Sequence, residues 1–190
     1  LRTEVSQTLT ADDKSISSER ATDIEKIMSG CPLLHSAFNE VLRVHASSLS
    51  TRIVLEDTSI GNDILLRKGG IVHMPSKCLH SDSKYFVPNV DTFDPARFLN
   101  GIPSKSQAAF RPFGGSSTLC PGRHFATMQV LSITALVLHS YDLIPEAGHW
   151  VCPRPLEGTM TTTVLPPVDV IRVRFQPRAE MEESAGIRRT

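Results

Sequence analysis

A mainly α-helical fold with small β-hairpin sheets, of the α+β class, is predicted by three features of the sequence. Apolar residues recur at helical spacing over residues 33–42, which indicates a helix with a wide apolar face. The longest apolar run, residues 125–138, is interrupted by Thr, Gln and Ser, so it is typical of a buried helix and not of a membrane span. Strand-like stretches at residues 49–55 and 63–74 are separated by glycine-containing turns, which is typical of hairpins. Further short strands are expected at residues 141–144 and 168–175.

The chain divides into three parts by composition. Residues 1–30 are polar and rich in Ser and Thr, and we expect there a lead-in made of the end of a helix and a linker. Residues 31–176 hold most of the apolar periodicity and are expected to form one domain, with a long irregular loop over residues 81–112. Residues 177–190 are charged and poor in apolar residues, so a disordered tail is expected.

Charge and cysteine usage exclude several function classes. The 20 basic and 20 acidic residues give a formal net charge of zero, which argues against a nucleic-acid partner because such proteins carry a basic surplus. The 4 cysteines form no C-x-x-C pair, so neither a disulfide framework nor a zinc site is indicated. If these cysteines are free thiols, a reducing compartment is expected.

The glycine-rich stretch that surrounds Cys120 carries the most specific signal. Cys120 directly precedes Pro121, which can occupy the first position of a helix that runs to about His139. The positive end of that helix would stabilise a thiolate. Gly114 and Gly122 permit tight turns and the close approach of a flat ligand. A lone cysteine in such a place is more often structural, so the surrounding pattern must decide between the two interpretations.

That pattern resembles the haem-binding signature of the cytochrome P450 family, Phe-x-x-Gly-x-Arg-x-Cys-x-Gly. Phe113, Cys120 and Gly122 match it, whereas Ser116 stands at the usual Gly and Thr118 at the usual Arg or His. Within the family, the chain is most similar to the subgroup of sterol hydroxylases and prostacyclin synthase, and it resembles a fungal member. That subgroup also lacks the Arg and often reads Cys-Pro-Gly-Arg. The resemblance implies haem b as cofactor and Cys120 as the axial iron ligand, whose thiolate favours O–O cleavage. The residues implied to bind the haem are Cys120, Phe113, Gly114, Gly122, Arg52 and Ala126.

A second element of the resemblance is a charged triad. Glu40 and Arg43 are three residues apart and share a helix face, which alone is typical of a solvated surface pair. The family has a near-obligatory Glu-x-x-Arg at this place, and residues 93–98 resemble its Phe-x-Pro-x-Arg-Phe segment. Arg97 is thereby implied to complete a buried triad that locks the loop presenting Cys120. His80 begins a stretch similar to the family's His-x-Asp. In the subgroup, an arginine at about the position of Arg52 binds a haem propionate, and Arg52 is implied to do the same.

The resemblance implies a monooxygenase that uses dioxygen and electrons from an NADPH-dependent reductase to hydroxylate a bulky apolar substrate such as a sterol or terpenoid, as in secondary metabolism. The segments implied to touch substrate contribute Ala46, Ser47, Ser48, Leu49, Met160 and Thr161. Basic residues near the cysteine loop could form a face for an acidic electron-donor protein. These are Lys105, Arg111, Arg123 and His124.

The chain is expected to be the C-terminal, haem-binding part of such an enzyme, because the family's oxygen-activating helix and N-terminal anchor have no counterpart in it. We therefore expect the isolated chain to be poorly stable and inactive. Membrane association, at the cytosolic face of the endoplasmic reticulum, is expected only through the N-terminal part. The alternatives are a haem-thiolate isomerase or dehydratase of the same fold, and a catalytically incomplete remnant. A cysteine hydrolase is disfavoured, because a proline directly follows the nucleophile.

Overall fold

The computed structural model describes residues 1–10, 20–87, 89–115, 119–156, 158 and 163–178, with only the backbone described at residues 20–23. The helices are α1 (Arg2–Thr10), α2 (Arg20–Gly30), α3 (Pro32–His45), α4 (Ser76–His80), α5 (Ser104–Gln107) and α6 (Arg123–Ser140). The strands are β1 (Leu49–Ile53), β2 (Thr58–Ile60), β3 (Ile64–Leu66), β4 (Ile71–Pro75), β5 (Tyr141–Pro145) and β6 (Val173–Pro177). The strands pair into two-stranded antiparallel sheets, β1 with β4, β2 with β3, and β5 with β6. The predicted fold class, helices with small hairpin sheets, is confirmed.

Helix α3 begins at Pro32, whose ring sets the backbone for the first turn and whose missing N–H needs no partner there. The next two amides are capped from a distance, because the Glu4 carboxylate of α1 accepts hydrogen bonds from the N–H groups of Leu33 at 2.7 Å and Leu34 at 3.0 Å. A carboxylate at this end also complements the helix dipole. Helix α1 therefore helps to start α3.

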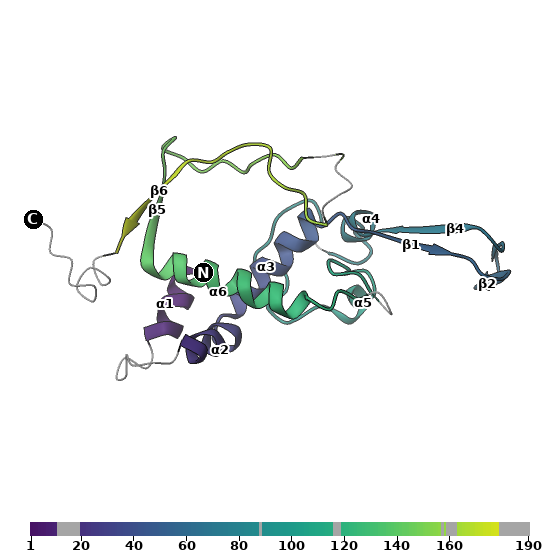
Figure 1. Ribbon diagram of the computed structural model, residues 1–190, viewed down its shortest axis with the longest axis horizontal. Coiled ribbons are helices and arrows are strands. Elements are labelled where there is room, and N and C mark those ends of the chain that lie inside the picture. Colours follow the sequence, from purple (N-terminus) through teal and green to yellow (C-terminus); the bar gives the residue numbers. More distant parts are fainter. Residues whose placement is uncertain (11–19, 88, 116–118, 157, 159–162, 179–190) are drawn as a thin grey trace, which may run out of the picture.

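The main core lies where α1, α2, α3 and α6 meet (Figure 1). Its buried residues are Val5, Ile27, Cys31, Leu34, Leu131 and Ala135, with Leu9, Met28 and Phe38 packed against them. Two of these residues, Val5 and Ile27, come from the segment expected to be a polar lead-in, and both are buried. Each such side chain contributes about 1.5–3 kcal/mol through burial. Residues 1–10 and 24–30 therefore contribute to the helical core.

A long β-ribbon projects from the helices (Figure 1). Strands β1 and β4 pair from Leu49 opposite Pro75 to Ile53 opposite Ile71, and the β2–β3 hairpin continues beyond them. Gly69 allows the turn before β4 because its φ of +80° lies in the left-handed region. The predicted hairpins are therefore present, one nested at the end of the other.

Residues 81–112, expected to be irregular, contain a second core made of aromatic side chains. Phe86, Phe98 and Ala109 are buried, and they pack against Leu79, Tyr85, Val90, Ile102 and Phe110. The Phe98 amide also donates to the Ser36 hydroxyl of α3 at 2.9 Å. This loop therefore has its own apolar centre and is tied to α3.

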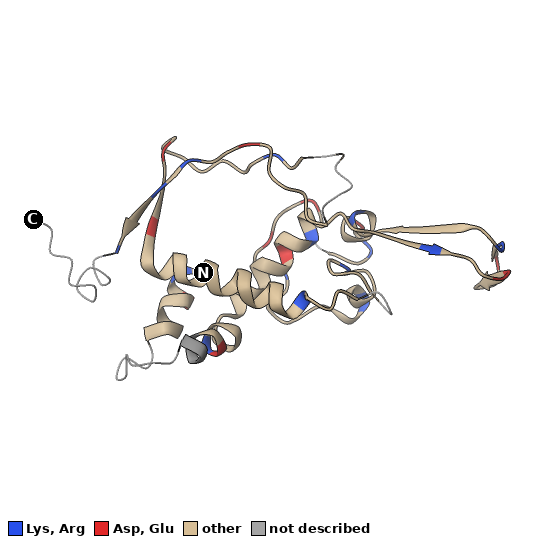
Figure 2. Cartoon of the chain, viewed as in Figure 1, with Lys and Arg blue, Asp and Glu red and all other residues tan. Residues whose placement is uncertain are grey.

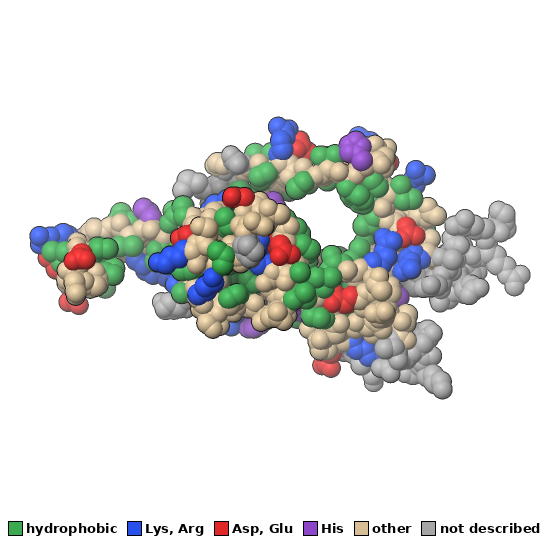
Figure 3. All heavy atoms as spheres, turned by 180° about the vertical axis from the view of Figure 1, so that it is seen from behind, with side chains coloured by type: hydrophobic (Ala, Val, Ile, Leu, Met, Phe, Trp, Pro, Cys, Tyr) green, Lys and Arg blue, Asp and Glu red, His purple; other side chains and the backbone are tan. Residues whose placement is uncertain are grey.

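Strands β5 and β6 carry the chain into a long arm, whose described residues are 146–156, 158 and 163–172 (Figure 1). The strand was expected to start at residue 168, and this predicted start is wrong, because regular pairing begins only at Val173, opposite Pro145. The tail boundary expected at residue 177 is also displaced, because Pro177 belongs to β6 and the Arg178 amide donates to the Ser140 carbonyl at 3.1 Å. Figure 3 shows an opening through the molecule between this arm and the helical body, with hydrophobic side chains along much of its edge.

Candidate functional site

The cysteine loop is closed by a backbone hydrogen bond. The Cys120 amide donates to the Phe113 carbonyl at 2.9 Å, which brings the two ends of the predicted motif together. Gly114 adopts a φ of +82°, a conformation that a residue with a Cβ adopts only with strain. The motif departures Ser116 and Thr118 lie outside the described residues. The structure thus brings Phe113, Gly114 and Cys120 into one closed loop.

The helix after the loop begins later than predicted. Helix α6 starts at Arg123 with Gly122 at the N-cap position, so the predicted start at Pro121 is wrong by two residues. Pro121 and Gly122 instead form a turn, in which the Cys120 carbonyl accepts from the Arg123 amide at 3.4 Å and from its Nη1 at 3.1 Å. A Cβ at position 122 would lie 3.9 Å from the Cys120 sulfur. Glycine therefore leaves this side of the thiol open to a ligand.

The structure also brings Glu40, Arg43 and Arg97 together. The Glu40 carboxylate accepts two hydrogen bonds from Arg43, each 2.8 Å long, and Arg97 Nε approaches its two oxygens at 3.1 and 3.0 Å. The side chains are 0%, 2% and 7% exposed, in the order Glu40, Arg43, Arg97. The Asp94 amide donates a further hydrogen bond to Glu40 at 3.0 Å. The triad therefore holds the loop of residues 94–97 against α3.

Burial alone would raise the pKa of Glu40. The hydrogen bonds from Arg43, from the Asp94 amide and from Arg97 outweigh that effect, so the pKa of Glu40 lies below its ordinary value. The carboxylate is thus ionised near neutral pH. Arg97 additionally donates to the carbonyls of Asn89 and Thr92, both at 3.0 Å, which ties a further turn of the loop to the same guanidinium.

His80 connects this triad to the cysteine loop. Its carbonyl accepts from Arg43 Nη1 at 3.0 Å, and its ring Nε2 accepts from the Arg111 amide at 2.9 Å. Burial lowers the pKa of His80 to about 4; the Arg43 hydrogen bond opposes this shift, and the charges of Arg43 and Lys77 add to it. The sequence pointed to His80 through a motif but not to this connection.

The remaining predicted haem-binding residues lie in two places. Ala126 is half-buried in the first turn of α6, where its amide donates to the Gly122 carbonyl at 2.9 Å. Arg52 lies on β1 in the projecting ribbon, and its Nη1 donates to the neighbouring Thr51 carbonyl at 2.8 Å. Ala126 therefore adjoins the cysteine loop, whereas Arg52 belongs to a separate element.

The segment predicted to touch substrate runs beside the end of the arm. The Ser47 amide donates to the Thr163 carbonyl at 2.8 Å, and the Leu165 amide to the His45 carbonyl at 3.1 Å. Ala46 is fully buried. Leu49 is exposed and Ser47 half-buried. Ser48 is also half-buried, and its hydroxyl lies 3.0 Å from that of Ser76; the predicted Met160 and Thr161 lie outside the described residues.

The donor set around Cys120 fits a haem better than a bare metal ion. Among the described residues, no group of three or more His, Cys, Asp or Glu side chains could hold a metal. Haem iron needs only an axial ligand from the protein, and the macrocycle needs apolar contacts. Cys120 is half-exposed, and its near neighbours in the sequence, Leu119 and Phe125, are 41% and 64% exposed. The residues present therefore match a single thiolate donor with exposed apolar residues near it in the sequence.

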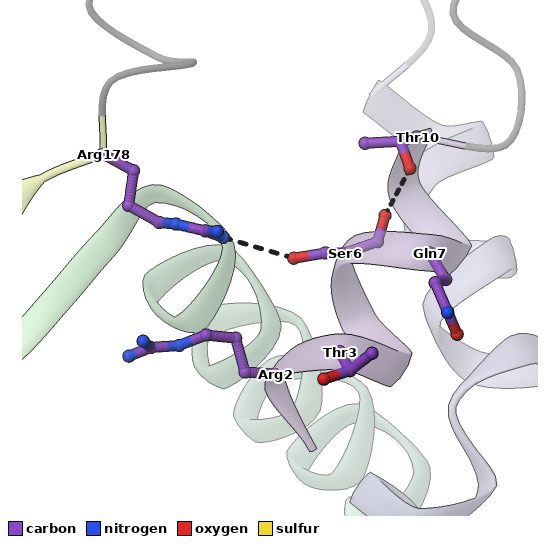
Figure 4. A pocket seen from close by; sticks show the side chains of 6 residues that line it. All are labelled: Arg2, Thr3, Ser6, Gln7, Thr10 and Arg178. Carbon is purple, nitrogen blue, oxygen red and sulfur yellow. Dashed lines mark hydrogen bonds between the residues drawn. The ribbon is translucent and has the colours of Figure 1, made fainter.

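A separate pocket of about 340 Å³ lies at the other end of α6 (Figure 4). Arg178, whose Nη1 donates to the Ser6 hydroxyl and to the His139 carbonyl at 3.3 Å each, forms one wall. The other lining residues are Arg2, Thr3, Ser6, Gln7 and Thr10 of α1. Because α6 has 18 residues, this pocket lies about 25 Å along the helix from the cysteine loop. It is distinct from the candidate site.

Charged side chains of both signs are interspersed over the described chain (Figure 2). Within the described ranges, no helix has the length and apolar character needed to cross a membrane. The exposed side of α6 is nevertheless apolar: Phe125, Val130, Ile133 and Leu136 each have large exposed fractions. Helix α6 thus has one apolar face in the core and another outside it.

Residues 1–170 match the family model described as cytochrome P450. The chain belongs to the cytochrome P450 family, whose members are oxidoreductases that carry haem b. It is 30% identical over 172 residues to cytochrome P450 monooxygenase nodJ of Hypoxylon pulicicidum, covering 86% of this chain and 34% of that protein. It is 34% identical over 142 residues to a cytochrome P450 monooxygenase of Gibberella zeae, covering 70% of this chain and 27% of that protein.

A mammalian relative is similar over nearly the same range. Cholesterol 7-alpha-monooxygenase of Cricetulus griseus is 27% identical over 190 residues, which covers 91% of this chain and 37% of that protein. The chain therefore spans about a third of the length of the curated relatives it matches. The resemblance read from the cysteine loop and the triad is confirmed at the level of the family.

Proposed function

We propose that this chain is the C-terminal, haem-binding part of a cytochrome P450 monooxygenase with Cys120 as the axial iron ligand. One observation carries the proposal. A single buried carboxylate, Glu40, binds two arginines and a loop amide. One of these arginines, Arg43, donates to the His80 carbonyl, and the His80 ring accepts from the Arg111 amide in the segment that closes on Cys120. Such a network positions a loop, and the residue that this loop presents is a half-exposed thiol.

The haem, when bound, supplies the iron at which dioxygen is activated. Cys120 would donate its sulfur, with Gly122 leaving space beside it. Phe113 and Ala126 would contact the macrocycle from the loop and from α6, and the backbone at Gly114 can approach it closely because it lacks a side chain. Arg52 would pair with a propionate through a charge-assisted hydrogen bond.

The proposed substrate is a bulky apolar molecule such as a sterol or terpenoid. The name of the hamster relative states that it acts on cholesterol, which favours a sterol-sized substrate. In this chain the substrate would meet Ser47, Ser48 and Leu49 together with Met160 and Thr161. The hydrogen bonds between residues 45–47 and 163–165 support this grouping, because they bring the two segments side by side.

Electrons are proposed to come from an NADPH-dependent reductase that docks near the cysteine loop. Lys105 and His124 are exposed, while Arg111 and Arg123 are half-buried. Arg123 also donates to the Cys120 carbonyl at 3.1 Å. The positive charges of Lys105, Arg111 and Arg123 lie close to Cys120 in the sequence, and an acidic donor protein would complement them.

The exposed apolar side of α6 is proposed to be covered by the larger remaining part of the enzyme. The relatives are about three times as long as the aligned range, and an exposed apolar helix face marks an interaction surface. We propose that this remaining part also carries a membrane anchor at the endoplasmic reticulum. The 190-residue chain alone is then expected to be inactive and poorly stable.

The test is the carbon monoxide difference spectrum of the reduced, haem-loaded protein, both for this chain and for the complete gene product that contains it. A strongly red-shifted Soret band that is lost in Cys120→Ser and retained in Cys152→Ser would support thiolate ligation by Cys120. Cys152 is a suitable control because it is exposed and lies in the arm. A complete gene product that shows no such band would overturn the proposal and indicate an inactive remnant.

A further inference from the structure

We infer that His80 is a positioning residue for the cysteine loop. Its ring Nε2 holds the loop as the acceptor of a hydrogen bond, so protonation of the ring breaks this bond and releases the loop. This inference deepens the proposed function and rests on it, since the loop matters because it presents Cys120. The residue does not touch the proposed ligand. It acts through Arg111.

The ring of His80 is held by packing and by one hydrogen bond. It is 0% exposed, and it packs against Phe86 and Phe110 with ring centroids 6.1 and 5.5 Å away. Its Nε2 accepts from the Arg111 amide at 2.9 Å, while its own carbonyl accepts from Arg43 Nη1 at 3.0 Å. The imidazole therefore sits between the triad and the start of the cysteine loop.

The hydrogen bond requires the neutral ring. A neutral imidazole has one donor and one acceptor nitrogen, so with Nε2 accepting, the proton is on Nδ1. Nδ1 is buried and has no hydrogen-bond partner among the residues that the structure describes. A protonated ring would have two donors, and its Nε2–H would point at the N–H of Arg111. The bond that holds Arg111 would then be lost.

The surroundings disfavour the charged ring. The charged groups that act on it are Arg43 from α3 and Lys77 from its own helix, and both are cationic. Burial is the largest effect, and the pKa of His80 is lowered to about 4. At neutral pH Nε2 is therefore an acceptor, and it becomes a donor only in acid.

Arg111 passes this constraint to the cysteine loop. Its amide is held by His80, and its carbonyl accepts from the Gly114 amide at 3.2 Å and from the Ser48 hydroxyl at 3.4 Å. Two residues further on, the Phe113 carbonyl accepts from the Cys120 amide. Loss of the His80 bond would leave the Arg111 amide unbonded, two residues before the Phe113 carbonyl that bonds to the Cys120 amide.

Two substitutions separate the acceptor from the ring. In His80→Gln, the amide oxygen can reach the position of Nε2, so the acceptor remains but does not titrate. In His80→Phe, the ring and its packing on Phe86 and Phe110 remain, but the acceptor is lost. A residue needed only for packing would tolerate Phe better than Gln. An acceptor role predicts the opposite order.

The experiment follows the red-shifted Soret band of the carbon monoxide complex of the complete, haem-loaded gene product from pH 8 to pH 4. We expect the wild-type band to decline in acid, the His80→Gln band to persist to a pH lower by about one unit or more, and the His80→Phe band to be reduced already at pH 7. Equal acid midpoints in all three proteins would overturn the inference. If no protein shows a Cys120-dependent band, the proposed function fails instead.

A second readout does not depend on haem. Hydrogen exchange of the Arg111 amide, corrected for its intrinsic pH dependence, reports the bond to His80 directly. We expect protection at pH 7 in the wild type and in His80→Gln, and at least a tenfold lower protection factor in His80→Phe. The same protection in all three would show that His80 does not hold Arg111, whatever Cys120 binds.

Discussion

Replacement of Glu40 by Gln tests the buried network at its centre. The wild-type carboxylate receives two hydrogen bonds from Arg43, the Nε of Arg97 and the amide of Asp94, all within 3.1 Å, and it is fully buried. Gln keeps the shape but removes the negative charge, and its NH₂ group would face N–H donors. The buried guanidinium groups of Arg43 and Arg97 then lose the negative charge of Glu40.

The expected loss follows from this geometry. Breaking a buried ion pair by removing one partner costs about 3–5 kcal/mol, so we expect about 4 kcal/mol, or roughly a thousandfold in the folding equilibrium. Because the urea slope rises with chain length, a slope of about 4 kcal/mol/M is expected for the complete gene product, and the midpoint of unfolding would fall by about 1 M. The assay is urea unfolding of the complete gene product. A loss below about 1 kcal/mol would refute the view that these charges are mutually compensated.

The matched control is an exposed ion pair with equally short contacts. Arg154 Nη2 lies 2.8 Å from the Asp169 carboxylate, as close as Arg43 lies to Glu40, but the side chains are 77% and 39% exposed. Because solvent screens this pair, Asp169→Asn is expected to leave the midpoint unchanged. A comparable loss in both variants would mean that contact distance, and not burial, determines the effect.

Three further predictions concern single residues. The pKa of His80 in the folded chain is about 4, below its ordinary 6.5, so its contribution to stability is complete above pH 6.5 and is lost as the pH falls toward 4. His80→Gln should therefore reduce the acid dependence of the unfolding free energy by about 3 kcal/mol over that range, and an unchanged slope would contradict this. Gly114→Ala should lower the free energy of unfolding by about 1–2 kcal/mol, because the φ of Gly114 is +82°. Gly122→Ala should cost less, because the φ of Gly122 is ordinary; thermal unfolding of both variants measures the difference. Glu4→Gln should weaken the capping of α3 by about 1 kcal/mol in urea unfolding, and no change would mean that the amides of Leu33 and Leu34 find other partners.

The elements with strong periodicity were predictable from the sequence. The helix over residues 33–42 is present as part of α3, and the helix after the cysteine loop differs from prediction by two residues at its start. The burial of Val5 in α1 was not predictable, because few apolar residues stand among the polar ones of that segment. The aromatic core of residues 81–112 has no sequence period, since its phenylalanines meet through tertiary contacts.

The site was predictable where residue type carries the chemistry. Glu40, Arg43, Arg97 and Cys120 could be found because their side chains have specific roles in a recognisable order. The link from His80 to Arg111 could not, because one partner is a backbone amide that any residue other than proline provides. The burial of Ala46 likewise depends on its pairing with Val164, about 120 residues away in sequence.

Stability alone does not explain why this site contains a buried ion network. Well-packed apolar residues in place of such a network are often as stabilising or more so, because each buried ion loses its hydration. Apolar packing, however, does not specify direction, whereas a carboxylate between two guanidinium groups does. Glu40 fixes Arg97 and the Asp94 amide on one side, and Arg43 fixes the His80 carbonyl on the other. Segments from three distant parts of the sequence thereby acquire one relative position, and the loop that ends at Cys120 is held against them through Arg111.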